Sequence, residues 1–150
     1  MPPERKEVVV LIADDDPDDR LLVHDAFKDL GFRCCLRFVE DGVELMSYLC
    51  RREGYRDPET APTPDLILLD LNMPRMDGHD ALKAIRSKGF KTTPVVMLST
   101  AGEERLVLKS YELGANAFVR KPQTFDGLKT AIDALKRFWI ELAELPPKQF

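Results

Sequence analysis

Short apolar runs alternate with amphipathic segments along the chain. The run from Val8 to Ala13 is continuously apolar and ends in acids, which is typical of a parallel strand covered on both faces. The apolar positions that follow recur at helical spacing, at Leu22, Val23, Ala26, Phe27 and Leu30. Asp16 is placed as a helix cap, Pro17 at the first helical position and Gly31 at the close. The pattern therefore predicts a strand followed by a helix that packs on it.

The same alternation continues through the rest of the sequence. Further strands are predicted at Arg33–Val39, Leu66–Leu69, Val95–Leu98 and Ala117–Val119, and further helices at Val43–Arg52, His79–Lys88, about Glu103–Leu113 and from Phe125 onward. Parallel neighbours require crossover connections, and those are right-handed. Five strands alternating with five helices thus predict an α/β fold with a parallel sheet and helices on both faces. A length of 150 residues suits one such domain.

Two segments depart from this alternation. Residues 51–64 hold three prolines and scattered charge, so we interpret them as a polar loop insertion. A helix from Phe125 to Glu144 would be roughly 30 Å long at about 1.5 Å per residue, which is longer than the strands can cover. Part of it should therefore overhang. Its last stretch is unusually apolar, with Phe138, Trp139, Ile140, Leu142, Ala143 and Leu145.

That apolar end predicts a partner interface, because exposed aromatic patches tend to mark interfaces. The alternative is that it packs back on the domain, beneath the insertion loop. We place the core at about residues 8–140 and the C-terminal helical extension at about residues 138–150.

Charge and composition exclude several classes of function. The net charge of −4 and the pI near 5.3 provide no electrostatic footprint for nucleic acid. No apolar run approaches the roughly 20 residues that cross a bilayer, and the start of the chain does not read as a signal peptide. We expect a soluble cytoplasmic protein with no membrane association. Cys34, Cys35 and Cys50 lack metal-ligand spacing and are interpreted as reduced packing thiols.

Polar residues stand at the ends of the predicted strands. They are Asp14 and Asp15, Asp70, Ser99 and Thr100, and Arg120 and Lys121. In an open parallel sheet, ligands bind outside the carboxyl ends of the strands. Carboxylates gathered there would raise one another's pKa unless a cation were present. Hard oxygen ligands suit Mg²⁺, and a lysine ammonium supplies a second positive charge.

This set of residues can accept a phosphoryl group. A carboxylate can act as the nucleophile while a metal ion and a lysine neutralise charge on the transferring oxygens. Asp70 is the best nucleophile candidate because it follows the central strand, and Asp14 and Asp15 would hold the metal. The Ser99 hydroxyl can donate to a phosphoryl oxygen. His24 and His79 lack metal-ligand spacing and are interpreted as surface residues.

At these residues the sequence resembles the receiver domain of two-component response regulators. The resemblance covers about residues 8–140. It is carried by Asp14-Asp15 after an apolar strand, Asp70 within LILLDLNMPRMDG, Ser99 in PVVMLST, and Lys121-Pro122 after AFVR. It implies a flavodoxin-like, doubly wound sheet of five parallel strands in the order 2-1-3-4-5, with five helices. We expect residues 1–150 to form a single receiver domain.

The resemblance also implies roles for individual residues. Asp70 takes a phosphoryl group from a histidine kinase, with Mg²⁺, or Mn²⁺ or Ca²⁺, bound by Asp70, one or both acids of the pair and the backbone carbonyl of Asn72. Lys121 contacts the phosphoryl group, and the peptide bond that follows it is usually cis. The family more often has Thr where Ser99 stands. Thr100 is adjacent, but consecutive strand residues face opposite ways, and we favour Ser99.

Phe118 stands where the family has its switch aromatic. Phosphorylation would draw Ser99 to the phosphoryl oxygens and free space for Phe118 to turn inward, changing the face made by the last strand and the helices beside it. The alternative is that Phe118 is simply a core residue. For Asp16, Asp18 and Asp19 we prefer a purely structural role at a helix N-terminus.

The loop insertion and the FW-containing tail resemble the single-domain regulators that partner phytochrome-type histidine kinases. This resemblance implies a sensor histidine kinase as partner, a bacteriophytochrome among the candidates, and a homodimer formed through the C-terminal region. The interface candidates are Phe138, Trp139, Leu142 and Leu145.

Two other functions were weighed against a signalling module. A phosphatase with Asp70 as nucleophile would need a second acid two residues on, where Asn72 stands. A phosphorylation-independent scaffold would be expected to lose some of the acids or the lysine. We therefore expect a signalling protein that catalyses only its own phosphotransfer and dephosphorylation.

Overall fold

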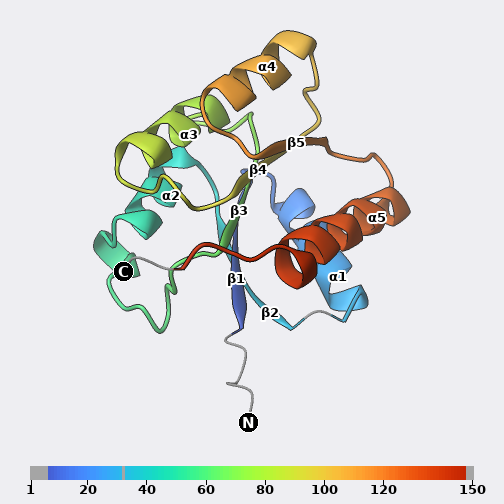
Figure 1. Cartoon of the computed structure of the whole chain (residues 1–150), viewed down its shortest axis with the longest axis horizontal. Helices are drawn as coiled ribbons and strands as arrows, with labels where there is room; N and C mark the ends of the chain where they lie inside the picture. Colours follow the sequence, from blue (N-terminus) through green and yellow to red (C-terminus); the bar gives the residue numbers. More distant parts are fainter. Residues whose placement is uncertain (1–6, 32, 148–150) are drawn as a thin grey trace.

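The computed structural model describes residues 7–31 and 33–147. Strands and helices alternate along these residues (Figure 1). The strands are β1 Val8–Ala13, β2 Cys34–Val39, β3 Leu66–Leu69, β4 Val95–Ser99 and β5 Ala117–Arg120. The α-helices are α1 Pro17–Asp29, α2 Gly42–Leu49, α3 Gly78–Ser87, α4 Glu104–Glu112 and α5 Phe125–Lys136. A 3₁₀ turn at Glu53–Tyr55 and a π-helical segment at Arg137–Leu142 complete the list.

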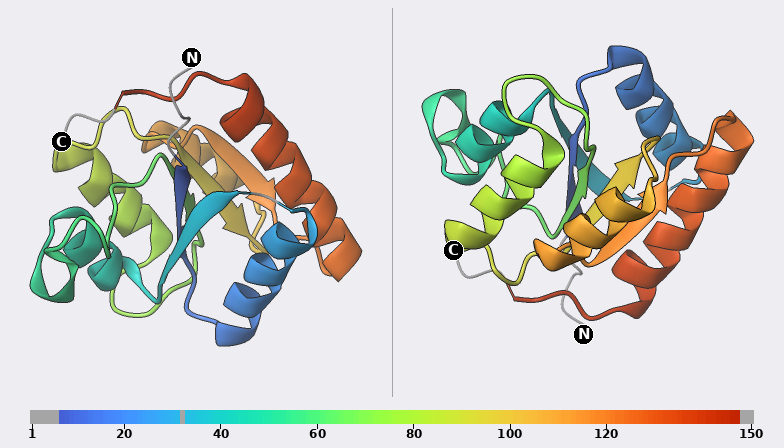
Figure 2. Two further views of the ribbon diagram at one scale, coloured as in Figure 1. Left: turned by 90° about the horizontal axis from the view of Figure 1, so that it is seen from below. Right: turned by 90° about the horizontal axis from the view of Figure 1, so that it is seen from above.

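All five strands are parallel and lie in the order β2-β1-β3-β4-β5. This confirms the predicted doubly wound α/β sheet. Helices α1 and α5 cover one face, and α2, α3 and α4 cover the other (Figures 1 and 2). The strand order reverses at β1, because β2 lies on one side of β1 and β3 lies on the other. In such sheets a crevice forms outside the carboxyl ends of the two strands at the reversal, which here are β1 and β3.

Both faces of the central strands are buried. In β1, Leu11 packs under α2 and α3 while Val10 and Ile12 pack under α1 and α5. In β3, Ile67 and Leu68 divide between the two faces in the same way. Successive strand residues point to opposite faces, so a strand covered twice must be apolar at every position. This explains why the strand sequences show apolar runs without alternation.

Side-chain caps set the starts of the helices. The Asp16 carboxylate accepts a hydrogen bond from the Asp18 amide and Pro17 is the first helical residue, as predicted. Asp41 and Asp77 cap α2 and α3 in the same way, which places these helix starts one residue before the predicted ones. Gly31 follows α1 with a φ of 71°, in the left-handed region that favours glycine.

The insertion at residues 51–64 packs against α2. It holds the short 3₁₀ turn but is otherwise a loop, as predicted. Tyr55 Oη donates to Glu44 Oε1 at 2.5 Å, and Tyr48 Oη donates to the Pro62 carbonyl at 2.7 Å. The Tyr48 and Tyr55 rings lie 5.1 Å apart. These contacts fasten the insertion to α2, and it is held to the sheet as well, because Arg37 of β2 donates to the Thr60 carbonyl.

The C-terminal region differs from the single long helix predicted to Glu144. The α-helix ends at Lys136 and π-helical turns continue to Leu142, closed by a bond from the Ala143 amide to the Phe138 carbonyl at 2.6 Å. Trp139 is partly buried against the core cluster on the face that α1 and α5 cover, so it does not project as predicted. In the π-helical turns, Trp139 is therefore partly buried while neighbouring apolar side chains are exposed.

Beyond Leu142 the chain runs in an extended form toward the connection after α3 (Figure 2). Leu145 is half-buried, and Pro146 and Pro147 line a small depression beside Phe90. Residues 148–150 of the predicted extension lie outside the described residues.

His79 is buried, which corrects its interpretation as a surface residue. It lies three residues before Leu82 on α3 and so shares the buried face of that helix. Ser110 Oγ donates to the Leu106 carbonyl, so the His79 Nε2–H donates to Ser110 Oγ at 2.8 Å. This pair joins α3 to α4. His24 is exposed on α1 and lies 3.3 Å from Asp25.

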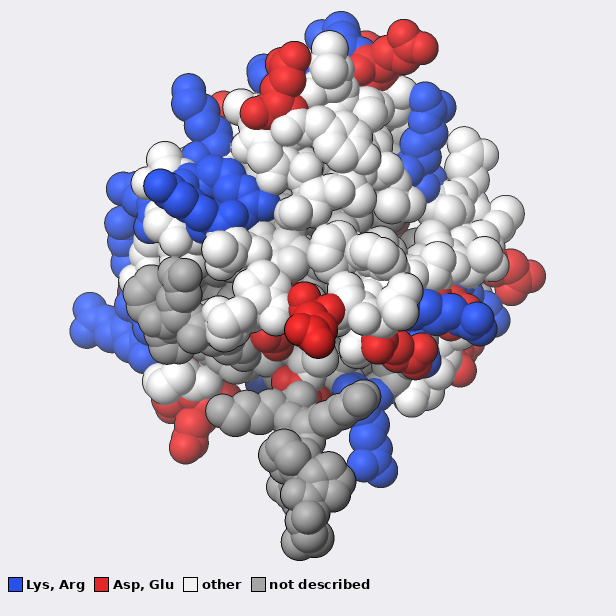
Figure 3. Space-filling view, viewed as in Figure 1, with Lys and Arg blue, Asp and Glu red and all other residues white. Residues whose placement is uncertain are grey.

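The surface carries charges of both signs. On the face shown in Figure 3, basic side chains gather beside α3, and acidic side chains lie both near them and farther off. Every helix among the described residues is too short or too polar to cross a membrane. Because acidic and basic side chains lie on the same face, the electrostatic potential over that face is mixed rather than of one sign.

The burial of His79 predicts a pH-dependent stability. Burial, with a smaller effect of Lys109, lowers the pKa of His79 below its ordinary value. As the pH falls through about 6.5, the unfolded chain binds this proton first, so wild-type stability declines. His79→Gln should lose less free energy of unfolding than wild type between about pH 7.5 and about pH 5. Urea denaturation at both pH values measures this, with His24→Gln as the matched control; identical pH dependence of wild type and His79→Gln would contradict it.

Candidate functional site

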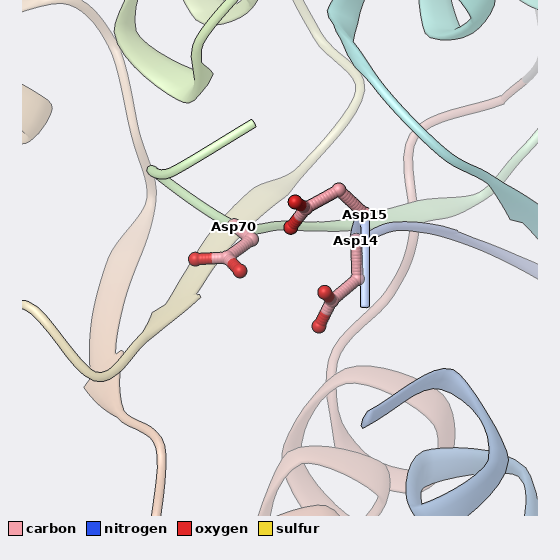
Figure 4. Close-up of side chains that lie close together, drawn as sticks. All are labelled: Asp14, Asp15 and Asp70. Atoms are coloured by element: carbon pink, nitrogen blue, oxygen red, sulfur yellow. The ribbon is translucent and has the colours of Figure 1, made fainter. Parts of the chain in front are cut away.

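Three aspartates meet at the carboxyl edge of the sheet. Asp14 and Asp15 follow β1, and Asp70 follows the neighbouring strand β3 (Figure 4). One carboxylate oxygen from each lies within 4.8 Å of the other two. Asp14 is buried, Asp15 is exposed and Asp70 is half-buried. The cluster thus combines one buried, one half-buried and one exposed carboxylate.

Lys121 enters the same crevice from the end of β5. Its Nζ lies 2.7 Å from Asp14 Oδ2, 3.1 Å from Asp19 Oδ2 and 3.5 Å from Asp70 Oδ2. Burial alone would lower the pKa of Lys121, but the hydrogen bond to Asp14 and the charge of Asp70 outweigh it, so this pKa is raised. The lysine therefore stays positively charged and partly neutralises the acids.

Burial raises the pKa of Asp70 above its ordinary value. Asp14 adds to this shift, while the ammonium of Lys121 and hydrogen bonds from Asn72 and Ser99 oppose it. The Asn72 amide lies 3.5 Å from Asp70 Oδ1. Asp70 is therefore an acid for which a further positive charge is favourable.

The oxygens of this cluster fit a small divalent cation. Asp14, Asp15 and Asp70 bring more negative charge than Lys121 neutralises, and hard cations such as Mg²⁺ bind carboxylate oxygen together with water. Among the described residues, this is the single group of acids, histidines or cysteines close enough to hold a metal ion.

The remaining predicted site residues surround the acids. Ser99 is fully buried at the end of β4 and its Oγ accepts from the Ala101 amide at 3.2 Å, whereas Thr100 is exposed. Asn72 is exposed on the loop after Asp70. Phe118 is half-buried in β5, and its amide donates to Tyr111 Oη at 3.2 Å.

The peptide bond after Lys121 is trans, so the cis bond implied by the resemblance is not found. The trans form is the lower-energy isomer of most X-Pro bonds.

Two residues of the first turn of α1 also contact the site. Asp19 was predicted to act only at the helix N-terminus, yet it bonds to Lys121. Arg20 Nη1 donates to the Asp14 carbonyl at 2.6 Å and Nη2 lies 3.6 Å from Glu40. The position of these two residues in the sequence could have indicated this role. A helix that begins directly after the acid pair places its first turn at the same edge of the sheet as those acids.

Glycine makes the connection after Asp70 possible. The Gly78 amide donates to the Leu71 carbonyl at 2.8 Å, and a Cβ at Gly78 would collide with the carbonyl oxygen of Asp70. The Asp-Gly pair that ends this loop is therefore required for the close approach of α3 to the end of β3.

Comparisons with known proteins agree with this geometry. Residues 10–133 match the response regulator receiver domain family. The response regulator Rcp1 of Synechocystis sp. is 34% identical over 139 residues, which cover 92% of both chains. The crystal structure of the Mn²⁺-bound form of Rcp1 superposes with a TM-score of 0.83 and covers 93% of this chain and 99% of that one.

Two further solved structures are similar over almost the whole chain. The phosphorylated cyanobacterial phytochrome response regulator RcpA is 33% identical, with a TM-score of 0.87 and coverage of 95% of this chain and 100% of its own. The response regulator RPA3017, in red light signaling of R. palustris, is 34% identical, with a TM-score of 0.88 and coverage of 94% and 99%. The chain belongs to the response regulator receiver domain family.

Proposed function

We propose that this protein is a phosphorylation-dependent switch in which Asp70 accepts a phosphoryl group from a sensor histidine kinase. The observation that carries the proposal is the meeting of Asp14, Asp15 and Asp70 with the buried ammonium of Lys121. Asp70 is reachable from the crevice, whereas the β3 residues that precede it are fully buried.

A divalent ion belongs to this proposal. Asp14, Asp15 and Asp70, with the backbone carbonyl of Asn72, would hold Mg²⁺ or, in its place, Mn²⁺ or Ca²⁺. When bound, the ion supplies positive charge that stabilises the transferring phosphoryl oxygens. The Mn²⁺-bound form of Rcp1 supports this assignment.

The protein's own residues divide the remaining work. An Asp70 carboxylate oxygen attacks phosphorus as the bond to the donor histidine nitrogen breaks. Lys121, whose raised pKa keeps it protonated, balances the charge of the new group. Ser99 lies beside Asp70 and donates its hydroxyl to a phosphoryl oxygen. These steps are positioning and charge neutralisation rather than covalent chemistry by other side chains.

The aspartyl phosphate would then change the conformation. It adds roughly −1.5 to −2 charge and three acceptor oxygens at the sheet edge. Ser99 moves toward them, and Phe118 turns inward to fill the space that Ser99 leaves. The surface of α4, β5 and α5 responds because Phe118 is bonded through its amide to Tyr111 at the end of α4.

The same residues argue against turnover of small substrates. Asn72 stands two residues after Asp70, where a phosphatase would place the acid that protonates the leaving group. We infer a signalling role in the cytoplasm, with catalysis limited to the protein's own phosphotransfer and dephosphorylation. The net charge of −4 supports a partner other than nucleic acid or membrane.

The partner we infer is a light-sensing kinase of the bacteriophytochrome type. RcpA is a phytochrome response regulator and RPA3017 acts in red light signaling, and both match this chain over more than nine-tenths of its length.

We further propose that the chain forms a homodimer through the C-terminal region. Phe138 and Leu142 are 50% and 75% exposed, and Phe138 packs edge-on against Trp139 at 4.9 Å. Trp139 is partly buried against the core beside this surface, and Leu145 is half-buried. An apolar patch on a helix end anchored in the core is typical of an interface.

Replacing the phosphoacceptor should abolish labelling. Asp70→Asn keeps the size of the side chain but removes the nucleophile, so labelling by radioactive acetyl phosphate with Mg²⁺ should fall on the order of a hundredfold or more. Asp126→Asn, at an exposed aspartate of α5, is the matched control and should label like wild type. Undiminished labelling of Asp70→Asn would remove the proposed mechanism.

The kinase partner can be identified by phosphotransfer profiling. Purified histidine kinases, including phytochrome kinases in light and in dark, are autophosphorylated and mixed with the protein. One phytochrome kinase should transfer at least about tenfold faster than the rest, because specificity is a difference in binding free energy. Faster transfer from kinases that do not sense light would contradict the inferred input.

The dimer can be tested with two substitutions that spare the core. Phe138→Ser with Leu142→Ser removes exposed apolar side chains but keeps Trp139, so the protein should fold and sediment as a monomer. Leu108→Ser removes an equally exposed leucine from α4 and should leave the dimer intact. Truncation after Arg137 should also give a monomer. A wild type that sediments as a monomer, or a double variant that remains dimeric, would exclude this interface.

A further inference from the structure

The loop between β3 and α3 carries Asn72 and leads directly out of Asp70. Its two ends are joined by the bond between the Gly78 amide and the Leu71 carbonyl, and the side chain of Met73 is buried in the core. Residues 74–76 lie between these anchors; the Met76 side chain packs against the core, and Arg75 and the Met76 carbonyl contact the start of α2. The shape of this loop therefore depends on a second element that holds it from outside.

Asp41, which precedes α2, provides that support. It is buried, and its Oδ1 accepts from the Glu44 amide at 2.8 Å as the helix cap. Its Oδ2 accepts from Arg75 Nε at 2.8 Å, with Arg75 Nη2 also 2.8 Å away. Arg75 thus places two nitrogens on one oxygen of a buried carboxylate.

A backbone contact lies beside this ion pair. The Gly42 amide donates to the Met76 carbonyl at 3.2 Å, and a Cβ at Gly42 would come within 2.6 Å of that oxygen. The approach of the loop to the start of α2 therefore requires a residue without a Cβ at position 42. The two contacts together fasten the part of the loop that Met73 and Gly78 leave free.

Arg75 itself has an unfavourable backbone conformation. Its φ is 64°, in the left-handed region that residues with a Cβ rarely adopt. Such a conformation persists only where the surrounding structure imposes it, and it is found most often beside functional sites. The ion pair with the buried Asp41 is the side-chain contact that accompanies this conformation, although the Arg75 side chain is 61% exposed.

We propose that Arg75 is a positioning residue of the phosphoacceptor site. Its ion pair with Asp41 holds residues 71–77 so that the Asn72 carbonyl and the Asp70 carboxylate keep the spacing that accepts the divalent ion. The Asn72 amide, 3.5 Å from Asp70 Oδ1, connects the loop to that carboxylate. The inference rests on the proposed function, because it assumes that this site binds the ion.

Arg75 could act through its positive charge or by positioning the loop, and these two roles predict opposite effects on cation binding when Arg75 is removed. Arg75 is positive, so its loss should strengthen binding of a cation if its charge alone matters. If it positions the loop, its loss should weaken binding, because the Asn72 carbonyl is no longer held in place. The direction of the change therefore separates the two roles.

Calorimetric titration of the full chain with Mg²⁺ measures this directly and without phosphorylation. Arg75→Ala should raise the Mg²⁺ dissociation constant about tenfold. Arg75→Lys keeps the charge and one donor to Asp41, and should remain within about threefold of wild type. Arg105→Ala removes an exposed arginine that pairs with Glu103 on α4, and should change binding less than about twofold.

The partner of the pair gives an independent test. Asp41→Asn still caps α2 but cannot form the ion pair, so it should weaken Mg²⁺ binding about as much as Arg75→Ala. The variant with both substitutions should be no weaker than either single variant, because both remove one contact. Circular dichroism confirms that each variant is folded. If Arg75→Ala does not fold, Asp41→Asn replaces it as the test, and wild-type Mg²⁺ binding by folded Asp41→Asn would overturn the role of Arg75.

Unchanged or tighter Mg²⁺ binding by folded Arg75→Ala, or additive effects in the double variant, would overturn the role of Arg75 and leave the proposed function intact. A wild-type chain that neither binds Mg²⁺ nor labels at Asp70 would overturn the proposed function, and this inference with it.

Discussion

Repulsion between carboxylates at one edge of a parallel sheet is the constraint on which the rest of the structure depends. Asp14, Asp15 and Asp70 are brought together by the topology, and Lys121 offsets part of their charge from the far side of the crevice. The site is left with net negative charge and a half-buried acid whose pKa is raised. The chain folds despite this repulsion, and binding of a cation at this edge would be favourable because it reduces the repulsion. The same unbalanced charge that costs stability thus prepares the chemistry.

Much of the fold could be predicted from the sequence because its strands are covered on both faces. An unbroken apolar run such as that of β1 permits few other interpretations, and the acids that follow it mark the end of the strand. The sheet order and the meeting of Asp14, Asp15, Asp70 and Lys121 then follow from the family's topology. Most bounds differed by a residue or two, since helix starts depend on caps such as Asp41, but α2 ends at Leu49, three residues before the predicted Arg52.

What could not be predicted depends on contacts between distant segments. His79 is a polar residue at a helix start, and its hydrogen bond with Ser110 of a distant helix satisfies this side chain in its buried position. The π-helical turns after Lys136 leave no distinct pattern in the sequence, because one added residue per turn shifts the apolar face gradually. The ion pair of Arg75 with Asp41 joins residues 34 apart in the chain. A pattern within one element cannot indicate such a pair.

Helix α5 runs antiparallel to the strands, from the acidic edge to the opposite end of the sheet. Its 12 residues span about 18 Å at roughly 1.5 Å per residue, and the exposed Phe138 and Leu142 lie beyond them. A kinase at Asp70 and a second subunit at the helix end would therefore not compete for space. In the proposed dimer, the two subunits would stay together during each encounter with the phosphodonor, and each subunit's Asp70 could be phosphorylated independently of the other.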